Sequence, residues 1–199
     1  MSASDLDSAI DAIRRGGVVA APTDTLVGLL ALARDASAVD AVLAIKGADR
    51  RAALPVLVHD LSAAEAIAAR FPDAARRLAT EGWPGPLTLI LPLRRGVLAP
   101  AVTAGGDTVG LRVPGPSTAL DLLRVLGEPL TGTSANVTGQ PPPVGSDGLS
   151  QEVVAAVDVV LPGRGSLGVA STVIDVTGEE PVVVRQGTFV VRTPGNRRH

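Results

Sequence analysis

Short apolar runs alternate along the chain with segments of helical periodicity, and this pattern restricts the possible folds more than any other feature. Strand-like runs such as Val18–Ala21 and Leu54–Val58 are separated by helical segments, but three further runs, 159–161, 172–176 and 182–185, follow one another near the C-terminus. Successive strands favour antiparallel pairs beside the parallel ones of a β-α-β series. The chain therefore predicts an α/β (α+β) domain with a mixed, twisted open sheet and flanking helices.

Capping residues and glycines mark the predicted helices. Ser4–Arg15 begins at an N-cap residue and ends at Gly16-Gly17, and the helix over 36–46 ends at Gly47. The same reasoning predicts further helices over 62–70, 73–81 and 116–126 and a short one closing at 153–157, further strands over 87–93 and 108–113, and loops over 94–107 and 138–149.

The length and hydropathy of the chain fit one domain. Its 199 residues, 46% of them hydrophobic, can bury a substantial core, so we expect a single domain over 1–199 with its core at about 8–190 and a frayed tail over 193–199. No apolar stretch approaches roughly 18 residues, which excludes a membrane span. The acidic start M-S-A-S-D-L-D does not resemble a secretory signal, so the sequence predicts a cytoplasmic protein.

Composition excludes several classes of chemistry. Without cysteine the chain has no disulfide, no thiolate nucleophile and no cysteine metal site, and His59 and His199 have no partner at metal-ligand spacing. No metal site is therefore predicted. The net charge of −2, the aromatic fraction of 2% and the absence of tyrosine disfavour an RNA surface. Direct tRNA binding is expected to be weak or absent.

The segment over 131–143, T-G-T-S-A-N-V-T-G-Q-P-P-P, concentrates hydrogen-bonding groups. Its hydroxyls, its amide and its accessible backbone N–H groups could bind an anion or another polar ligand. The same composition is also common in ordinary polar turns. Residues from other segments must decide between the two interpretations.

Four further polar segments lie where predicted strands begin or end, as active-site residues often do. They are P-T-D-T over 22–25, T-V-G-L-R over 108–112, S-T-V-I-D over 171–175 and R-Q-G over 185–187. Strand alternation places Thr108, Gly110 and Arg112 on one face, where the arginine suits a carboxylate or a phosphate. An Asx-turn at 22–25 and an edge-strand salt bridge at Arg112 are the alternative explanations.

Lys46 is the only lysine in a chain that otherwise uses arginine for every basic position. A compact ammonium at a helix end suits a phosphate, although a contact with the helix dipole would also explain it. The chain contains neither a G-x-x-x-x-G-K-[ST] loop nor a G-x-G-x-x-G motif. Nucleotide chemistry would therefore require a different scaffold.

Taken in order, these segments resemble the YrdC/Sua5 family in its short form. The shared motifs are P-T-D-T-L-x-G-L (22–29), Lys46-Gly47, L-P-V-L-V (54–58), W-P-G-P-L-T (83–88), G-L-R-V-P (110–114), T-S-A-N-V-T-G (133–139), S-T-V-I-D (171–175) and R-Q-G (185–187). Each motif is short, but the ordered set is specific and covers about residues 8–190. The resemblance implies a twisted open sheet with a concave, positively lined cavity.

The family resemblance implies a threonylcarbamoyl-AMP synthase, a nucleotidyltransferase. Such an enzyme condenses L-threonine, bicarbonate and ATP into threonylcarbamoyl-adenylate and pyrophosphate, and a downstream transferase complex then modifies tRNA. Mg²⁺ would be the cofactor, carried by the phosphates of ATP. The substrates supply the nucleophile, so the protein would mainly position anions and neutralise their charge.

Residue by residue, the resemblance implies two sets of contacts. Thr25, Arg112 and Ser171 would bind L-threonine, and Lys46 would act in catalysis near the phosphates. The residues expected to bind ATP are Thr108, Gly132, Ser134, Asn136, Pro142 and Arg185.

Three positions depart from the family pattern. Val27 replaces the usual tyrosine, Ala48 replaces the arginine of Lys-x-Arg, and Ala52 replaces an asparagine. Arg50 or Arg51 is expected to compensate for the missing guanidinium. Two alternatives remain open: a divergent paralogue that binds nucleotide or RNA without this activity, and an enzyme that makes a different carbamoyl-adenylate.

Overall fold

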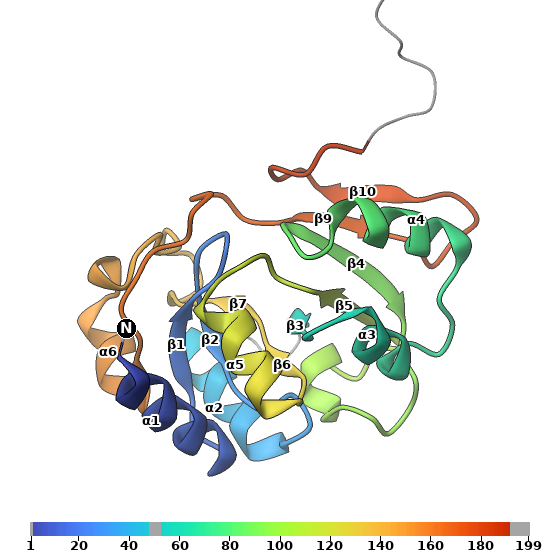
Figure 1. Cartoon of the computed structure of the whole chain (residues 1–199). Coiled ribbons are helices and arrows are strands. Elements are labelled where there is room, and N and C mark those ends of the chain that lie inside the picture. Colours follow the sequence, from blue (N-terminus) through green and yellow to red (C-terminus); the bar gives the residue numbers. More distant parts are fainter. Residues whose placement is uncertain (1, 48–52, 192–199) are drawn as a thin grey trace, which may run out of the picture.

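A computed structural model describes residues 2–47 and 53–191 of the chain (Figure 1). Its helices are α1 (Ala3–Arg14), α2 (Ala36–Lys46), α3 (Leu61–Ile67), α4 (Asp73–Gly82), α5 (Thr118–Leu126) and α6 (Gln151–Ala156), with short 3₁₀ helices η1 (Pro100–Thr103) and η2 (Ser146–Gly148). Its strands are β1 (Val19–Pro22), β2 (Val27–Leu30), β3 (Val56–Leu57), β4 (Leu87–Pro92), β5 (Thr108–Arg112), β6 (Leu130–Thr131), β7 (Thr133–Ser134), β8 (Val159–Val160), β9 (Thr172–Asp175) and β10 (Val182–Arg185).

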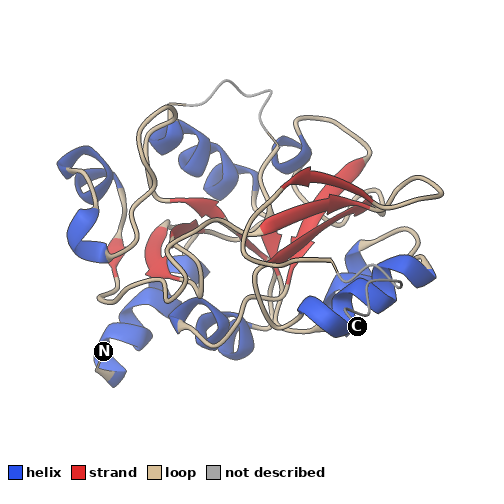
Figure 2. Cartoon of the chain, turned by 90° about the horizontal axis from the view of Figure 1, so that it is seen from above, coloured by secondary structure: helices blue, strands red, loops and turns tan. Residues whose placement is uncertain are grey.

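The strands form two mixed sheets, one of four strands in the order β7-β2-β1-β8 and one of six in the order β10-β9-β4-β5-β3-β6. In the larger sheet, β4 pairs in parallel with β9 and antiparallel with β5. Figure 2 shows the strands through the middle of the molecule with helices on both sides. The predicted α/β class with a mixed arrangement is confirmed, although the strands are divided between two sheets.

The segment over 129–134 joins the two sheets. β6 pairs with β3 of the larger sheet, and β7 pairs with β2 of the smaller one. Thr131 also donates hydrogen bonds from its backbone N–H to the Ala31 carbonyl and from its Oγ1 to the Leu29 carbonyl, at 2.9 and 3.0 Å. At Gly132, between the two strands, a Cβ would lie only 2.5 Å from Cγ of Leu57. Only glycine fits this junction without displacing its neighbours.

Burial on both faces explains why β1 is apolar throughout. Val19 and Ala21 belong to a cluster of buried residues that includes Ile13 of α1 and Leu122 of α5. Residues of the opposite parity, such as Ala20, pack into the larger core that α2 covers. A strand covered on both faces has no polar face, so its sequence does not alternate between polar and apolar residues.

Most of the predicted elements are present. The bounds of α2 are those expected, and the helices and strands near 73–82, 87–92 and 172–175 agree within a residue or two. The sequence missed β2, β6 and β7, which are short and lie beside the polar motifs. Residues 193–199, the predicted frayed tail, lie outside the described residues. Over 2–47 and 53–191, no helix combines the length and the apolar character needed to cross a membrane.

Candidate functional site

A cavity of about 370 Å³ lies where the junction segment meets the end of β5 and the start of β9. It brings together seven of the residues that the sequence singled out: Thr25, Arg112, Gly132, Ser134, Pro142, Ser171 and Arg185. These residues come from five separate motifs. The remainder of the lining consists of Thr23, Leu26, Val27, Gly28, Ala53, Pro55, Leu57, Thr88, Thr133 and Ala170.

Arg112 anchors one end of the cavity. Its side chain is buried, as is that of Asp24, with which its Nη2 forms a hydrogen-bonded ion pair. Its Nε donates to the carbonyl of Gly85 at 2.9 Å, and its Nη1 donates to Oγ1 of Thr25 at 3.0 Å. Three described partners therefore fix the plane of the guanidinium. Three of its five N–H groups are used in these bonds, so donors remain for an anion.

Ser171 and Arg185 form the neighbouring wall. Oγ of Ser171 lies 2.8 Å from the Oγ1 of Thr88, and Nη2 of Arg185 donates to the same Ser171 Oγ at 3.2 Å. Nε and Nη2 of Arg185 also donate to the Ser171 carbonyl, at 3.1 and 3.0 Å. The arginine is therefore held at the start of β9 although it is more exposed than Arg112. Two guanidinium groups thus face one cavity.

The electrostatic environment of the arginines follows from burial. Burial lowers the pKa of Arg112, the Asp24 carboxylate opposes this effect, and the charge of Arg185 lowers the pKa further. Burial also lowers the pKa of Arg185. Both groups stay protonated in proteins at neutral pH. A bound anion would relieve the mutual repulsion of the two cations.

Lys46 holds the end of the cavity that Ser134 lines. Its buried ammonium donates to the Ser134 carbonyl at 2.8 Å and to Oδ1 of Asn136 at 3.1 Å. The Nδ2 of Asn136 in turn donates to the carbonyls of Val137 and Gln140, at 2.9 and 2.8 Å. Burial lowers the pKa of Lys46. Lys46 and Asn136 therefore do not line the cavity themselves but hold Ser134, which does.

The structure does not bring Thr108 to the cavity. This exposed residue begins β5 opposite Pro92, while Arg112 ends the strand. At about 3.3 Å per residue the two positions are about 13 Å apart. The assignment of Thr108 to ATP stays a prediction. Arg50 and Arg51, expected to compensate for Ala48 and Ala52, lie outside the described residues together with both alanines.

Two cavity residues were missed as site candidates. Thr88 of β4 pairs with Val173 of β9, and its Oγ1 lies 2.8 Å from Oγ of Ser171. Thr23 accepts from the backbone N–H groups of Thr25 and Leu26 and shapes the turn between β1 and β2. Both stand in motifs that the sequence had marked, Thr88 at the end of W-P-G-P-L-T. The available signals were a buried threonine inside an apolar strand, for Thr88, and the place of Thr23 two residues before Thr25 in P-T-D-T.

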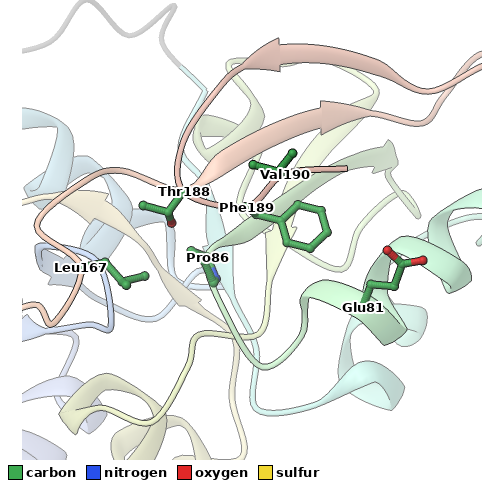
Figure 3. A pocket seen from close by; sticks show the side chains of 6 residues that line it. All are labelled: Glu81, Pro86, Leu167, Thr188, Phe189 and Val190. Atoms are coloured by element: carbon green, nitrogen blue, oxygen red, sulfur yellow. The ribbon is translucent and has the colours of Figure 1, made fainter. Parts of the chain in front are cut away.

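A second cavity, of about 540 Å³, is larger but chemically different. It is lined by Glu81, Pro86, Leu167, Thr188, Phe189 and Val190. Figure 3 shows Glu81 approaching from one side and Leu167 from the other, with the ring of Phe189 between them. Among its described lining residues the only charged group is the Glu81 carboxylate, so it suits anions less well than the arginine-lined cavity. Within residues 2–47 and 53–191, no cluster of three or more histidine or carboxylate side chains could hold a metal.

Known proteins resemble the chain closely. The sequence model of the Sua5/YciO/YrdC family, described as "Telomere recombination", matches residues 11–187. A threonylcarbamoyl-AMP synthase of Pyrococcus abyssi is 38% identical over 178 residues, which are 88% of this chain and 52% of that protein. A putative threonylcarbamoyl-AMP synthase of Mycobacterium tuberculosis is 40% identical over 185 residues, 90% of this chain and 82% of the relative.

Solved structures agree with the sequence comparisons. P. abyssi Sua5 complexed with L-threonine superposes with a TM-score of 0.88 at 36% identity, covering 92% of this chain and 54% of that one. Escherichia coli YciO gives a TM-score of 0.79 at 29% identity, covering 92% and 89%. The chain spans about half the length of its P. abyssi and Bacillus subtilis relatives. Since the family's sequence model matches residues 11–187 and the superposition on P. abyssi Sua5 covers 92% of the chain, the chain belongs to the Sua5/YciO/YrdC family.

Proposed function

We propose that the protein is a threonylcarbamoyl-AMP synthase, which condenses L-threonine, bicarbonate and ATP into threonylcarbamoyl-adenylate and pyrophosphate. The observation that carries the proposal is the convergence of seven predicted ligand residues on one cavity of about 370 Å³. Relatives named for this activity are 38 and 40% identical to the chain. Support comes from their similarity and from the anion-binding character of the cavity.

The Arg112 end of the cavity suits the amino acid. A guanidinium with free N–H groups is well matched to a carboxylate. The hydroxyls of Thr25 and Ser171 lie within hydrogen-bonding reach of the arginine network and could bind the hydroxyl or amine of threonine. P. abyssi Sua5, a structural neighbour, is known in complex with L-threonine.

The Ser134 end suits the nucleotide. Ser134, Gly132 and Pro142 line the cavity, and Lys46 lies directly beneath Ser134. Because Lys46 does not line the cavity, its part in the proposed site is to hold Ser134 and to place a positive charge behind it. Arg185, between the two ends, could bridge the carboxylate and the phosphates. Thr108 is not among the described lining residues, so it is not included in the proposed site.

The reaction requires little from the protein beyond holding the substrates in the right positions. The threonine amine bonds to the carbon of CO₂ derived from bicarbonate and loses a proton, giving a carbamate. A carbamate oxygen then bonds to the α-phosphorus of ATP while the bond to the β-phosphate oxygen breaks and pyrophosphate leaves. Arg112, Arg185 and Lys46 would neutralise the anions that must approach one another.

Mg²⁺ would enter as part of the substrate. The described lining of the cavity includes no carboxylate, so the protein offers the ion no ligand set of its own. Mg²⁺ commonly binds through substrate phosphates and water, which fits delivery with ATP. We place the reaction in the cytoplasm, where ATP and tRNA are available, and expect a downstream transferase complex to take the product without direct tRNA binding by this chain.

Pyrophosphate release from ATP and bicarbonate tests the proposal. We expect release that depends on L-threonine, with mass-spectrometric detection of threonylcarbamoyl-adenylate. Release driven by another amine or carbamoyl donor would indicate a different carbamoyl-adenylate. ATP binding without release under any condition would indicate a non-catalytic paralogue. An Arg112→Lys variant is the matched control, because it keeps the positive charge but loses the planar guanidinium that can bind a carboxylate with two hydrogen bonds.

A further inference from the structure

We propose that Asp24 is a positioning residue that makes the Arg112 end of the cavity select a zwitterionic amino acid over a multivalent anion. This inference rests on the proposed function. It extends that function by assigning a role to a carboxylate that does not line the cavity.

The ion pair between Asp24 and Arg112 is almost fully buried. The side chains of Asp24 and Arg112 are each only 7% exposed, and Oδ1 of Asp24 accepts from Nη2 of the arginine. Nη1 donates to Thr25, the next residue after Asp24. Residues 24 and 25 therefore hold both terminal nitrogens, and they leave the arginine only one orientation toward the cavity.

Asp24 is in turn fixed from outside the pair. Its backbone carbonyl accepts from Oγ of Ser166 and from the N–H of Leu167, each at 3.0 Å. A Cβ on Gly115 would lie 3.0 Å from Asp24 Oδ2, so the backbone at residue 115 packs directly against the carboxylate. Oδ2 is buried and has no hydrogen-bond partner among the described residues. Tight packing thus holds the carboxylate where its charge acts on Arg112.

The charge balance gives Asp24 its effect on specificity. Arg112 and Arg185 would together present two positive charges, and Asp24 cancels one of them. A dianion such as phosphate interacts with each charge about twice as strongly as a monoanion does, because the Coulomb energy scales with the product of the charges. A zwitterion also carries an ammonium, which a nearby carboxylate favours. Asp24 therefore penalises phosphates at this end and favours an amino acid.

Titration calorimetry without ATP tests this inference, with L-threonine and inorganic phosphate as separate probes. For Asp24→Asn we expect threonine affinity to fall about tenfold or more and phosphate affinity to rise several-fold. Asp147→Asn is the matched control, because Asp147 pairs with Arg164 at 3.1 Å on the surface, where the side chains are 74 and 65% exposed. We expect both affinities of the control to be unchanged.

Gly115→Ala provides a second variant in case Asp24→Asn does not fold. It keeps the charge but crowds the carboxylate, so we expect weaker threonine binding with phosphate affinity unchanged. Unaltered affinities, or equal losses for both probes, would overturn the role of Asp24. Failure of the natural chain to bind threonine would contradict the proposed function instead. The phosphate measurement on Asp24→Asn would then still decide whether the carboxylate excludes dianions.

Discussion

The ammonium of Lys46 donates a hydrogen bond to the backbone carbonyl of Ser134, with Nζ and O 2.8 Å apart. This bond connects the last residue of α2 to β7, and the N–H of Thr138 returns a bond to the Lys46 carbonyl at 2.8 Å. The end of α2 thus supports both sides of the T-S-A-N segment. A charge-assisted bond to a backbone carbonyl fixes the loop more firmly than a neutral one would.

Replacing Lys46 with methionine should weaken nucleotide binding more than threonine binding. The variant keeps an apolar stem of similar length but loses the donors to Ser134 and Asn136. These bonds, worth about 1.5–3 kcal/mol, hold Ser134 rather than ATP, so their loss sets an upper limit of about ten- to a hundredfold on the fall in ATP affinity. Calorimetry with ATP and with threonine measures both values. Equal losses for the two ligands would contradict a local role for Lys46.

Replacing Gly132 with alanine should destabilise the junction between the sheets. The new Cβ would lie 2.5 Å from Cγ of Leu57, which is fully buried and has little room to move. Overpacking of this kind costs about 1–3 kcal/mol. Urea unfolding measures the loss, with Gly178→Ala as control because its Cβ would meet nothing closer than 3.9 Å. Equal stability of the two variants would show that the junction can relax.

Much of the fold was readable because helix ends and buried strands leave local signals. α2 begins at Asp35, whose side chain accepts from Ser37 and Ala38, and ends at the left-handed Gly47. Strands β6 and β7 left no such signal. Each comprises two residues. β7 pairs with β2, which lies about a hundred residues earlier in the chain, and β6 pairs with β3, which is separated from it by fewer residues. Long-range pairing decides such strands, so local sequence patterns cannot show them.

The order of the motifs allowed several site residues to be predicted. It could not show where a residue lies along its strand or which distant residue it contacts. Ser171 and Arg185 were assigned from their motifs, and the structure brings them into hydrogen-bond contact. Thr108 was assigned from its motif and its strand face, but the position along the strand places it at the far end from Arg112. Thr88 went unnoticed because its partner, Ser171, lies more than eighty residues away along the chain.

Truncation of the two cavity arginines should destabilise the protein to different extents. Arg112→Ala leaves the buried Asp24 carboxylate unpaired, which costs about 3–5 kcal/mol of stability. Arg185 has no carboxylate partner within the described chain and is more exposed, so Arg185→Ala should change stability by less than about 1 kcal/mol while lowering anion affinity. Urea unfolding and phosphate titration on both variants separate the two effects. Equal destabilisation of the two variants would contradict a stabilising role of the ion pair between Arg112 and Asp24.

The alkaline pH dependence of stability should isolate a single side chain. The chain contains one lysine, no tyrosine and no cysteine, so below the arginine range only Lys46 and the N-terminus titrate at high pH. Burial lowers the pKa of Lys46 in the folded chain below the ordinary value of 10.5. Between these two values the unfolded chain binds more protons than the folded one, so stability must rise with pH there.

Comparison of the natural chain with Lys46→Met tests whether Lys46 makes stability rise with pH. The N-terminus titrates in both proteins and cancels from the difference between them. Urea unfolding from neutral pH up to 10.5 should therefore show the free energy of unfolding of the natural chain rising relative to that of the variant. Parallel curves would mean that the folded chain leaves the Lys46 pKa unchanged. A falling difference would mean that the bonds to Ser134 and Asn136 stabilise the ammonium by more than burial disfavours it.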